Sequence, residues 1–175
     1  MHVHITYTGG TIGMVDSPHG LVPGADLEGW LDSLLAGTPL ARSVTVTSLA
    51  PLIDSSNATP LSWQAIVDDL RAHAAADPRT AFVILHGTDT MAYTAAALSY
   101  LIQNSPKPIV LTGSQQPMAN PFTDAKLNLY HSVLYAIDEK SCGVVVVFGN
   151  EVIAGTRAHK QRTLSFNAFT SMNFP

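Results

Sequence analysis

The sequence predicts a three-layer α/β sandwich around a mostly parallel β-sheet. Several short segments are apolar along their whole length, segments with helical periodicity separate them, and glycine-containing turns follow them. Such strands are buried on both faces, which is typical of parallel sheets covered by helices on either side. With 175 residues, 46% hydrophobic and 13% charged, the chain is expected to form one domain, residues 1–175.

The expected elements alternate between strand and helix. Residues 3–8 (VHITYT) predict the first strand, because apolar and β-branched residues continue without a break up to Gly9 and Gly10. Residues 13–25 contain three glycines and two prolines and predict a loop. The other expected strands, which are continuously apolar or β-branched, are residues 43–49, 81–86, 108–112 and 143–148. The expected helices are residues 26–37, 62–76, 91–104 and 124–138.

Small, polar turns follow four of the expected strands. They are Thr8-Gly9-Gly10-Thr11, Ile53-Asp54-Ser55-Ser56, Gly87-Thr88-Asp89-Thr90 and Thr112-Gly113-Ser114-Gln115. Ligands of open α/β sheets bind beyond the carboxyl ends of the strands, so four such turns at one edge predict a site for a small polar ligand. Taken singly, Thr88 and Asp89 are better explained as helix caps, and composition alone favours an exposed surface lysine at Lys160.

The composition argues against several classes of function. A formal net charge of -4 without a basic stripe argues against a nucleic-acid partner, and no apolar run reaches the ~20 residues that span a membrane. The N-terminus lacks the features of a signal peptide, and Cys142 is the sole cysteine, so a cytoplasmic location is expected. No phosphate-binding glycine motif occurs, and His2 and His4 share a strand face without a third ligand. We therefore expect no cofactor and no metal.

Five motifs then resemble those of a known family. TGGTIGM, IDSSN, ILHGTDTMAYTAAALS, IVLTGSQQPM and FNAFTSMNFP are similar, in this order and spacing, to successive motifs of the L-asparaginases, most closely the bacterial cytoplasmic type I branch. The resemblance extends over residues 3–175. It implies the fold of the asparaginase N-terminal domain, with flavodoxin-like winding of the sheet.

The resemblance also implies an activity, the hydrolysis of L-asparagine to L-aspartate and ammonia through a threonine acyl-enzyme without a metal. Thr11 matches the nucleophile, and Thr88, Asp89 and Lys160 match a triad that activates a hydroxyl or the attacking water. The positions that match substrate-binding residues are Gly10, Asp54, Ser55, Ser56, Gly87 and Ser114. Of these, residues 54–56 would hold the α-carboxylate, and the backbone carbonyl at Ser114 would lie near the leaving amide.

The chain departs from the family pattern at several positions. Leu21 stands where the family has a tyrosine that bonds the nucleophile, His159 replaces a threonine before Lys160, and Phe122 replaces an arginine. The usual C-terminal domain is absent, so the chain is either a natural short form, which its initial Met favours, or an isolated domain. We expect it to cover the exposed apolar surface by forming a homodimer or higher homo-oligomer.

Two alternatives to the asparaginase reading stay open at this point. One is a module that binds an amino acid without turning it over, given the absent tyrosine and closing domain. The other is an amidohydrolase acting on glutamine or a larger asparaginyl amide, because one methylene alters binding by only ~1–3 kcal/mol. Ammonia release from saturating asparagine separates the first alternative from an enzyme.

Overall fold

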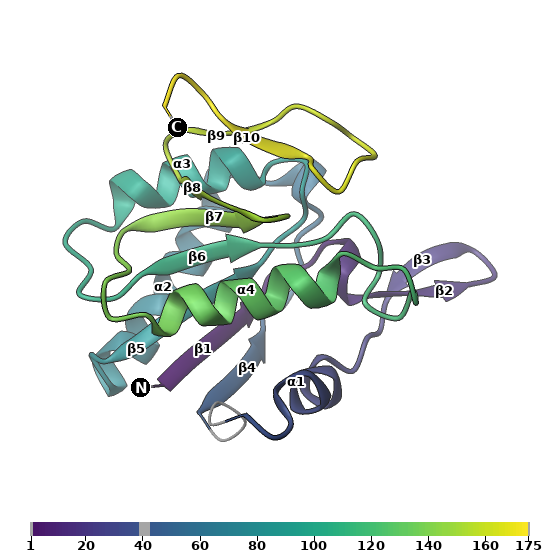
Figure 1. Cartoon of the computed structure of the whole chain (residues 1–175), viewed down its shortest axis with the longest axis horizontal. Coiled ribbons are helices and arrows are strands. Elements are labelled where there is room, and N and C mark those ends of the chain that lie inside the picture. The colour runs from purple at the N-terminus through teal and green to yellow at the C-terminus, as the bar shows by residue number, and fades with distance from the viewer. Residues whose placement is uncertain (1, 39–42, 175) are drawn as a thin grey trace.

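A computed structural model describes residues 2–38 and 43–174 (Figure 1). Six strands make the main sheet: β1 (His2–Tyr7), β4 (Val44–Ser48), β5 (Thr80–Leu85), β6 (Ile109–Thr112), β7 (Val144–Phe148) and β8 (Glu151–Ala154). The α-helices are α1 (Leu27–Leu35), α2 (Pro60–Ala76), α3 (Met91–Leu101) and α4 (Ala125–Ile137). All nine predicted strands and helices occur at the predicted places.

The main sheet has the strand order β4-β1-β5-β6-β7-β8. The first five strands pair in parallel, and β8 pairs antiparallel with β7 at one edge. Counted in sequence order, the five parallel strands lie in the order 2-1-3-4-5, which is flavodoxin-like winding. The predicted fold class is therefore confirmed.

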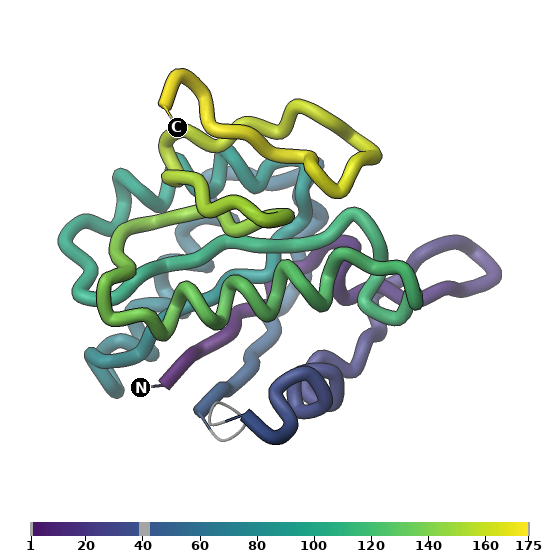
Figure 2. The backbone as a smooth tube through the Cα atoms, in the orientation of Figure 1, coloured from purple at the N-terminus to yellow at the C-terminus, as the bar shows by residue number. Residues whose placement is uncertain are grey.

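Helices cover both faces of this sheet, α1 and α4 on one side and α2 and α3 on the other (Figure 1, Figure 2). Strand β5 shows how the core divides, since successive side chains of a strand point to opposite faces. Val83 and Leu85 pack in the cluster that contains the apolar residues of α1 and α4. Phe82 and Ile84 pack with those of α2 and α3. Burial on both sides explains why the segment is apolar throughout.

The structure adds elements that the sequence pattern did not predict. The segment predicted as a loop contains an antiparallel hairpin, β2 (Met14–Ser17) and β3 (Gly20–Pro23), which projects from the body of the domain (Figure 1). A second hairpin joins β9 (Ala158–Lys160) to β10 (Phe169–Ser171). The prediction of a loop was wrong here because cross-strand pairing stabilises segments with little apolar alternation. Two short 3₁₀ turns, η1 (Thr11–Gly13) and η2 (Ser55–Asn57), lie at the carboxyl edge.

Two further observations concern the helices. Helix α3 ends at Leu101 rather than 104, because Ile102 is extended and Asn104 has a positive φ of 59°. None of the helices in the described part of the chain combines the length and the hydropathy needed to cross a membrane.

Candidate active site

The turns after β1 and β5 lie against each other at the carboxyl edge of the sheet. A Cβ atom on Gly10 would lie 2.6 Å from the Cα atom and the amide nitrogen of Gly87, and Gly10 has a φ of +94°. A Cβ atom on Gly87 would overlap the side chain of Ser55. Glycine at both predicted positions therefore lets the turns that carry Thr11, Thr88 and Ser55 approach one another.

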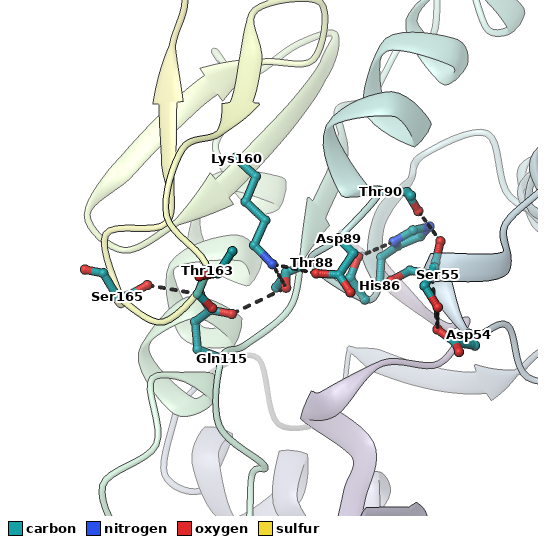
Figure 3. Close-up of polar contacts among 12 residues, drawn as sticks. Asp54, Ser55, His86, Thr88, Asp89, Thr90, Gln115, Lys160, Thr163 and Ser165 are labelled. Atoms are coloured by element: carbon teal, nitrogen blue, oxygen red, sulfur yellow. Dashed lines mark hydrogen bonds and ion pairs between the residues drawn. The ribbon is translucent and has the colours of Figure 1, made fainter.

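Lys160 joins two of the predicted catalytic residues (Figure 3). Its Nζ atom donates to the hydroxyl of Thr88 at 2.8 Å and to Oδ1 of Asp89 at 2.7 Å. The lysine side chain comes from β9 and is only 13% exposed, so it is not a surface lysine. Nor do Thr88 and Asp89 cap α3, whose N-cap residue is Thr90. The structure thus brings the three residues together, as the matched motifs imply.

Gln115 is a further member of this cluster that the sequence did not single out. Its Oε1 atom accepts a long hydrogen bond, 3.4 Å, from the Thr88 hydroxyl, and its Nε2 atom donates to the carbonyl oxygens of Thr163 and Ser165 (Figure 3). Two carbonyl acceptors on one side require the amide nitrogen there, so the amide oxygen faces Thr88. Since the Lys160 ammonium only donates, the proton of Thr88 points to Gln115.

The turn after β6 is held by a buried carboxylate. Asp124, which is 8% exposed, accepts hydrogen bonds from the backbone N–H groups of Gln115 and Gln116 and from the amide of Asn128. Ser114 is buried, and its hydroxyl donates to the carbonyl oxygen of Gln116. Its side chain therefore supports the turn, which leaves backbone groups as the means by which position 114 could contact a ligand.

The turn after β4 forms the other end of the cluster. Asp54 caps η2, because its Oδ1 accepts from the backbone N–H of Ser56 at 3.0 Å and from the Ser56 hydroxyl at 2.7 Å. These hydrogen bonds lower the pKa of Asp54 below its usual value. Thr90 donates to the carbonyl oxygen of Ser55 at 2.6 Å and thereby links this turn to the one that carries Thr88 (Figure 3). Among the described residues, the Ser55 hydroxyl has no hydrogen-bond partner.

A buried histidine supports the turn after β5 from below. His86 is 1% exposed, and its Nδ1 lies 2.7 Å from the carbonyl oxygen of Gly87, while its Nε2 lies 3.0 Å from the Thr94 hydroxyl. Burial lowers the pKa of His86, although the hydrogen bond to Gly87 opposes that shift. The imidazole is therefore neutral at pH 7. Its hydrogen bonds fix the backbone of the turn that carries Thr88.

Thr11 differs from the other predicted catalytic residues. Within residues 2–38 and 43–174, its hydroxyl has no hydrogen-bond partner. The phenol of Tyr7 lies beneath the same turn and donates to the carbonyl oxygen of Gly10 at 3.3 Å, and burial raises the pKa of this tyrosine. Leu21, at the place of the tyrosine implied by the motifs, is 44% exposed in β3. Among the described residues, no side chain therefore forms a hydrogen bond with the Thr11 hydroxyl.

Comparison with known proteins identifies the family. The model of the N-terminal asparaginase domain matches residues 2–175. The chain belongs to the asparaginase family. It is 41% identical to L-asparaginase 1 of Escherichia coli K12 over 99% of this chain and 51% of that protein. The crystal structure of L-asparaginase I from Vibrio cholerae is 40% identical, with a TM-score of 0.88, over 99% of this chain and 52% of that one.

A third relative is similar at lower sequence identity. The structure described as a probable cytoplasmic L-asparaginase from Campylobacter jejuni is 29% identical, with a TM-score of 0.78, over 97% of this chain and 51% of that one. The chain thus spans about half the length of these asparaginases.

Proposed function

We propose that this domain hydrolyses the side-chain amide of L-asparagine to L-aspartate and ammonia. The observation that carries the proposal is the contact of one largely buried ammonium, Lys160, with both Thr88 and Asp89 beside the turn that bears Thr11. Such a lysine–carboxylate–hydroxyl set has no evident purpose in a protein that only binds its ligand, whereas a threonine nucleophile needs help to lose its proton.

The reaction proceeds in two steps on Thr11. In the first, its Oγ attacks the amide carbon, the C–N bond breaks, and the hydroxyl proton passes to the leaving nitrogen, which departs as ammonia. In the second, water attacks the resulting ester, and one of its protons returns to Oγ of Thr11 as aspartate leaves. Thr88, with Asp89 and Lys160, activates the attacking group in these steps, and Gln115 orients the Thr88 hydroxyl.

The surrounding turns supply groups for binding. The backbone N–H groups of Thr88 and Asp89 donate to no described residue and are available to a developing oxyanion. Asp89 is 63% exposed and can bind the α-ammonium, while the η2 turn, with Asp54, Ser55 and Ser56, can bind the α-carboxylate. Gly10 and Gly87 let the turns that carry Thr11, Thr88 and Ser55 pack closely enough to surround one small ligand.

We also propose that these residues act as a single catalytic domain in the cytoplasm and that a second copy of the chain covers its apolar surface. Large apolar side chains are exposed on α3 and on the segments near the site: Tyr93, Tyr100, Phe122, Leu164 and Phe174. Where such side chains form a contiguous patch, they favour association. Light scattering at micromolar concentration should show a dimer or larger, and a monodisperse monomer would contradict the oligomer.

The C. jejuni relative, itself described as probably cytoplasmic, supports the proposed cytoplasmic location.

The decisive experiment is ammonia release from L-asparagine by the 175-residue chain, with Thr11→Ala as its matched control. Release that disappears in the variant supports the proposal. Binding of L-aspartate by calorimetry without ammonia release would indicate a binding module instead. Parallel assays with L-glutamine and an asparaginyl conjugate would reveal whether the preferred substrate is a different amide.

A further inference from the structure

Two histidines and one aspartate form a cluster on the face of the sheet that α2 covers. His4 comes from β1, and Asp69 and His73 come from α2. One ring nitrogen from each histidine and one carboxylate oxygen all lie within 4.8 Å of one another. The cluster stands apart from the polar turns: His4 lies within β1, whereas Thr11 follows the end of that strand. None of its members takes part in the proposed reaction.

We propose that His4, Asp69 and His73 bind a divalent transition-metal ion, most simply Zn²⁺. Two imidazoles and a carboxylate are ligands that Zn²⁺ accepts, with water completing a tetrahedral site. The sequence alone offered His2 and His4 as a pair without a third ligand. In the folded chain the partners of His4 are instead Asp69 and His73, more than sixty positions away. A bound metal ion would therefore join β1 to α2.

The spacing of the His4 and Asp69 ligand atoms suits such an ion. His4 Nε2 lies 3.5 Å from Asp69 Oδ2, close to the ~3.4 Å that separates two ligands around a tetrahedral ion with Zn–N and Zn–O bonds of ~2.0–2.1 Å. Asp69 and His73 are four residues apart on one helix, so they project from the same face. Nδ1 of His73 is 2.9 Å from the carbonyl oxygen of Asp69, a contact that commonly leaves the other ring nitrogen for a metal.

A second layer of hydroxyl groups fixes the ligands. Thr45 Oγ1 lies 3.1 Å from Nδ1 of His4, and Thr6 donates to Oδ2 of Asp69 at 2.6 Å. Metal-binding histidines characteristically bond their second nitrogen in this way. These contacts hold the imidazole of His4 and the carboxylate of Asp69 in fixed orientations.

One side chain must move to bind the ion. The rings of His4 and His73 are stacked, with centroids 3.5 Å apart and an interplanar angle of 19°, so their lone pairs do not converge on one point. His4 is fully buried, whereas the His73 side chain is 35% exposed, so the ring of His73 is the one that turns. The ion displaces the contact of 3.2 Å between His4 Nε2 and the Thr47 hydroxyl. The exposed side of His73 gives the ion a route in and leaves room for its water.

The test is a titration of the EDTA-treated, dialysed chain with Zn²⁺ by calorimetry, and with Co²⁺ by visible absorption, which reports coordination geometry. We expect one ion per chain and the intense absorption of tetrahedral Co²⁺. His73→Ala and Asp69→Asn should each weaken binding at least about tenfold, and Thr45→Ala by ~10–100-fold. Zn²⁺ should raise the thermal midpoint of the wild type and not that of His73→Ala.

Two matched histidine variants keep this test specific. His19→Ala removes an exposed histidine in the β2–β3 hairpin, and His2→Ala removes the neighbour that shares Thr45 with His4. Both should bind as the wild type does. Unchanged affinity in a folded His73→Ala variant, or loss of binding in His2→Ala alone, would overturn the proposal. Because no readout is catalytic, the result is independent of the proposed asparaginase activity.

Discussion

The two threonines assigned to the reaction differ in how the domain holds them. Around Thr88, Lys160 and Gln115 fix the hydroxyl from two sides, and buried His86 supports the turn from behind. Around Thr11, the backbone is fixed by the close contact of Gly10 with the turn after β5, but no described side chain forms a hydrogen bond with the hydroxyl. The Thr88 side chain is therefore oriented before a ligand binds, whereas at Thr11 only the backbone is held in place.

The strongest test removes each hydroxyl in turn. Thr11→Ala and Thr88→Val should each lower ammonia release by about 10³-fold or more, because residues that act as a unit lose most of their effect together. Thermal unfolding should be near that of the wild type, since both side chains lie at the surface of the site. A near wild-type rate in either variant would remove that residue from the mechanism.

The next test loosens Thr88 without removing it. Gln115→Leu takes away the acceptor that orients the Thr88 proton, and kcat should fall about fivefold, since a hydrogen bond of this kind contributes roughly 1 kcal/mol. KM should change little if Gln115 acts only through Thr88. Gln64→Leu is the matched control, because Gln64 is exposed and bonds only to Asp68. Equal kcat values in the two variants would show that the contact with Gln115 is incidental.

A third test gives Thr11 the partner it lacks. Leu21→Tyr restores a phenol to the hairpin position where the family motif has one, and kcat/KM should rise about fivefold if that hydroxyl bonds Thr11. Leu21→Phe supplies the same ring without the hydroxyl and should leave kcat/KM unchanged. If both variants behave alike, the hairpin does not bring residue 21 to the nucleophile.

The smallest effect concerns pH and the support of Thr88. The pKa of His86 is lowered in the folded protein, so the unfolded chain binds its proton first as pH falls below about 6.5. Stability is then fully present above that pH and declines below it, by at most ~1.4 kcal/mol per pH unit for this one proton. Urea unfolding at pH 7 and pH 5.5 should show the decline, and His86→Gln should reduce it. An exposed-histidine control, His159→Gln, should not.

The sequence predicted the parts of this molecule that local patterns determine. Strand β5 could be predicted because it is buried on both faces, and this burial requires an apolar segment such as AFVILH. The β9–β10 hairpin was missed because its strands are three residues long and gain stability from each other rather than from composition. Helices and parallel strands of normal length could therefore be located, whereas the short hairpins could not.

The candidate site likewise contains residues that could be predicted from the sequence and residues that could not. Residue types and motif order led to Thr88, Asp89 and Lys160, which the structure brings within hydrogen-bonding distance. The role of Gln115 was out of reach, since it depends on carbonyl oxygens 48 and 50 residues further along the chain. The cluster of His4 with Asp69 and His73 was hidden for the same reason, because only the fold brings a helix residue beside a strand residue.

The late position of Lys160 in the chain has a consequence for synthesis. Thr88 precedes it by 72 residues, and all five parallel strands are translated before β9. At ~5–20 residues per second, the ribosome needs roughly 4–14 seconds to travel from one to the other. During that interval the nascent chain can form its parallel strands, while Thr88 and Asp89 do not yet have Lys160 as a partner. The contacts of Lys160 with Thr88 and Asp89 therefore form after the parallel strands have been synthesised, as one of the last parts of the candidate site.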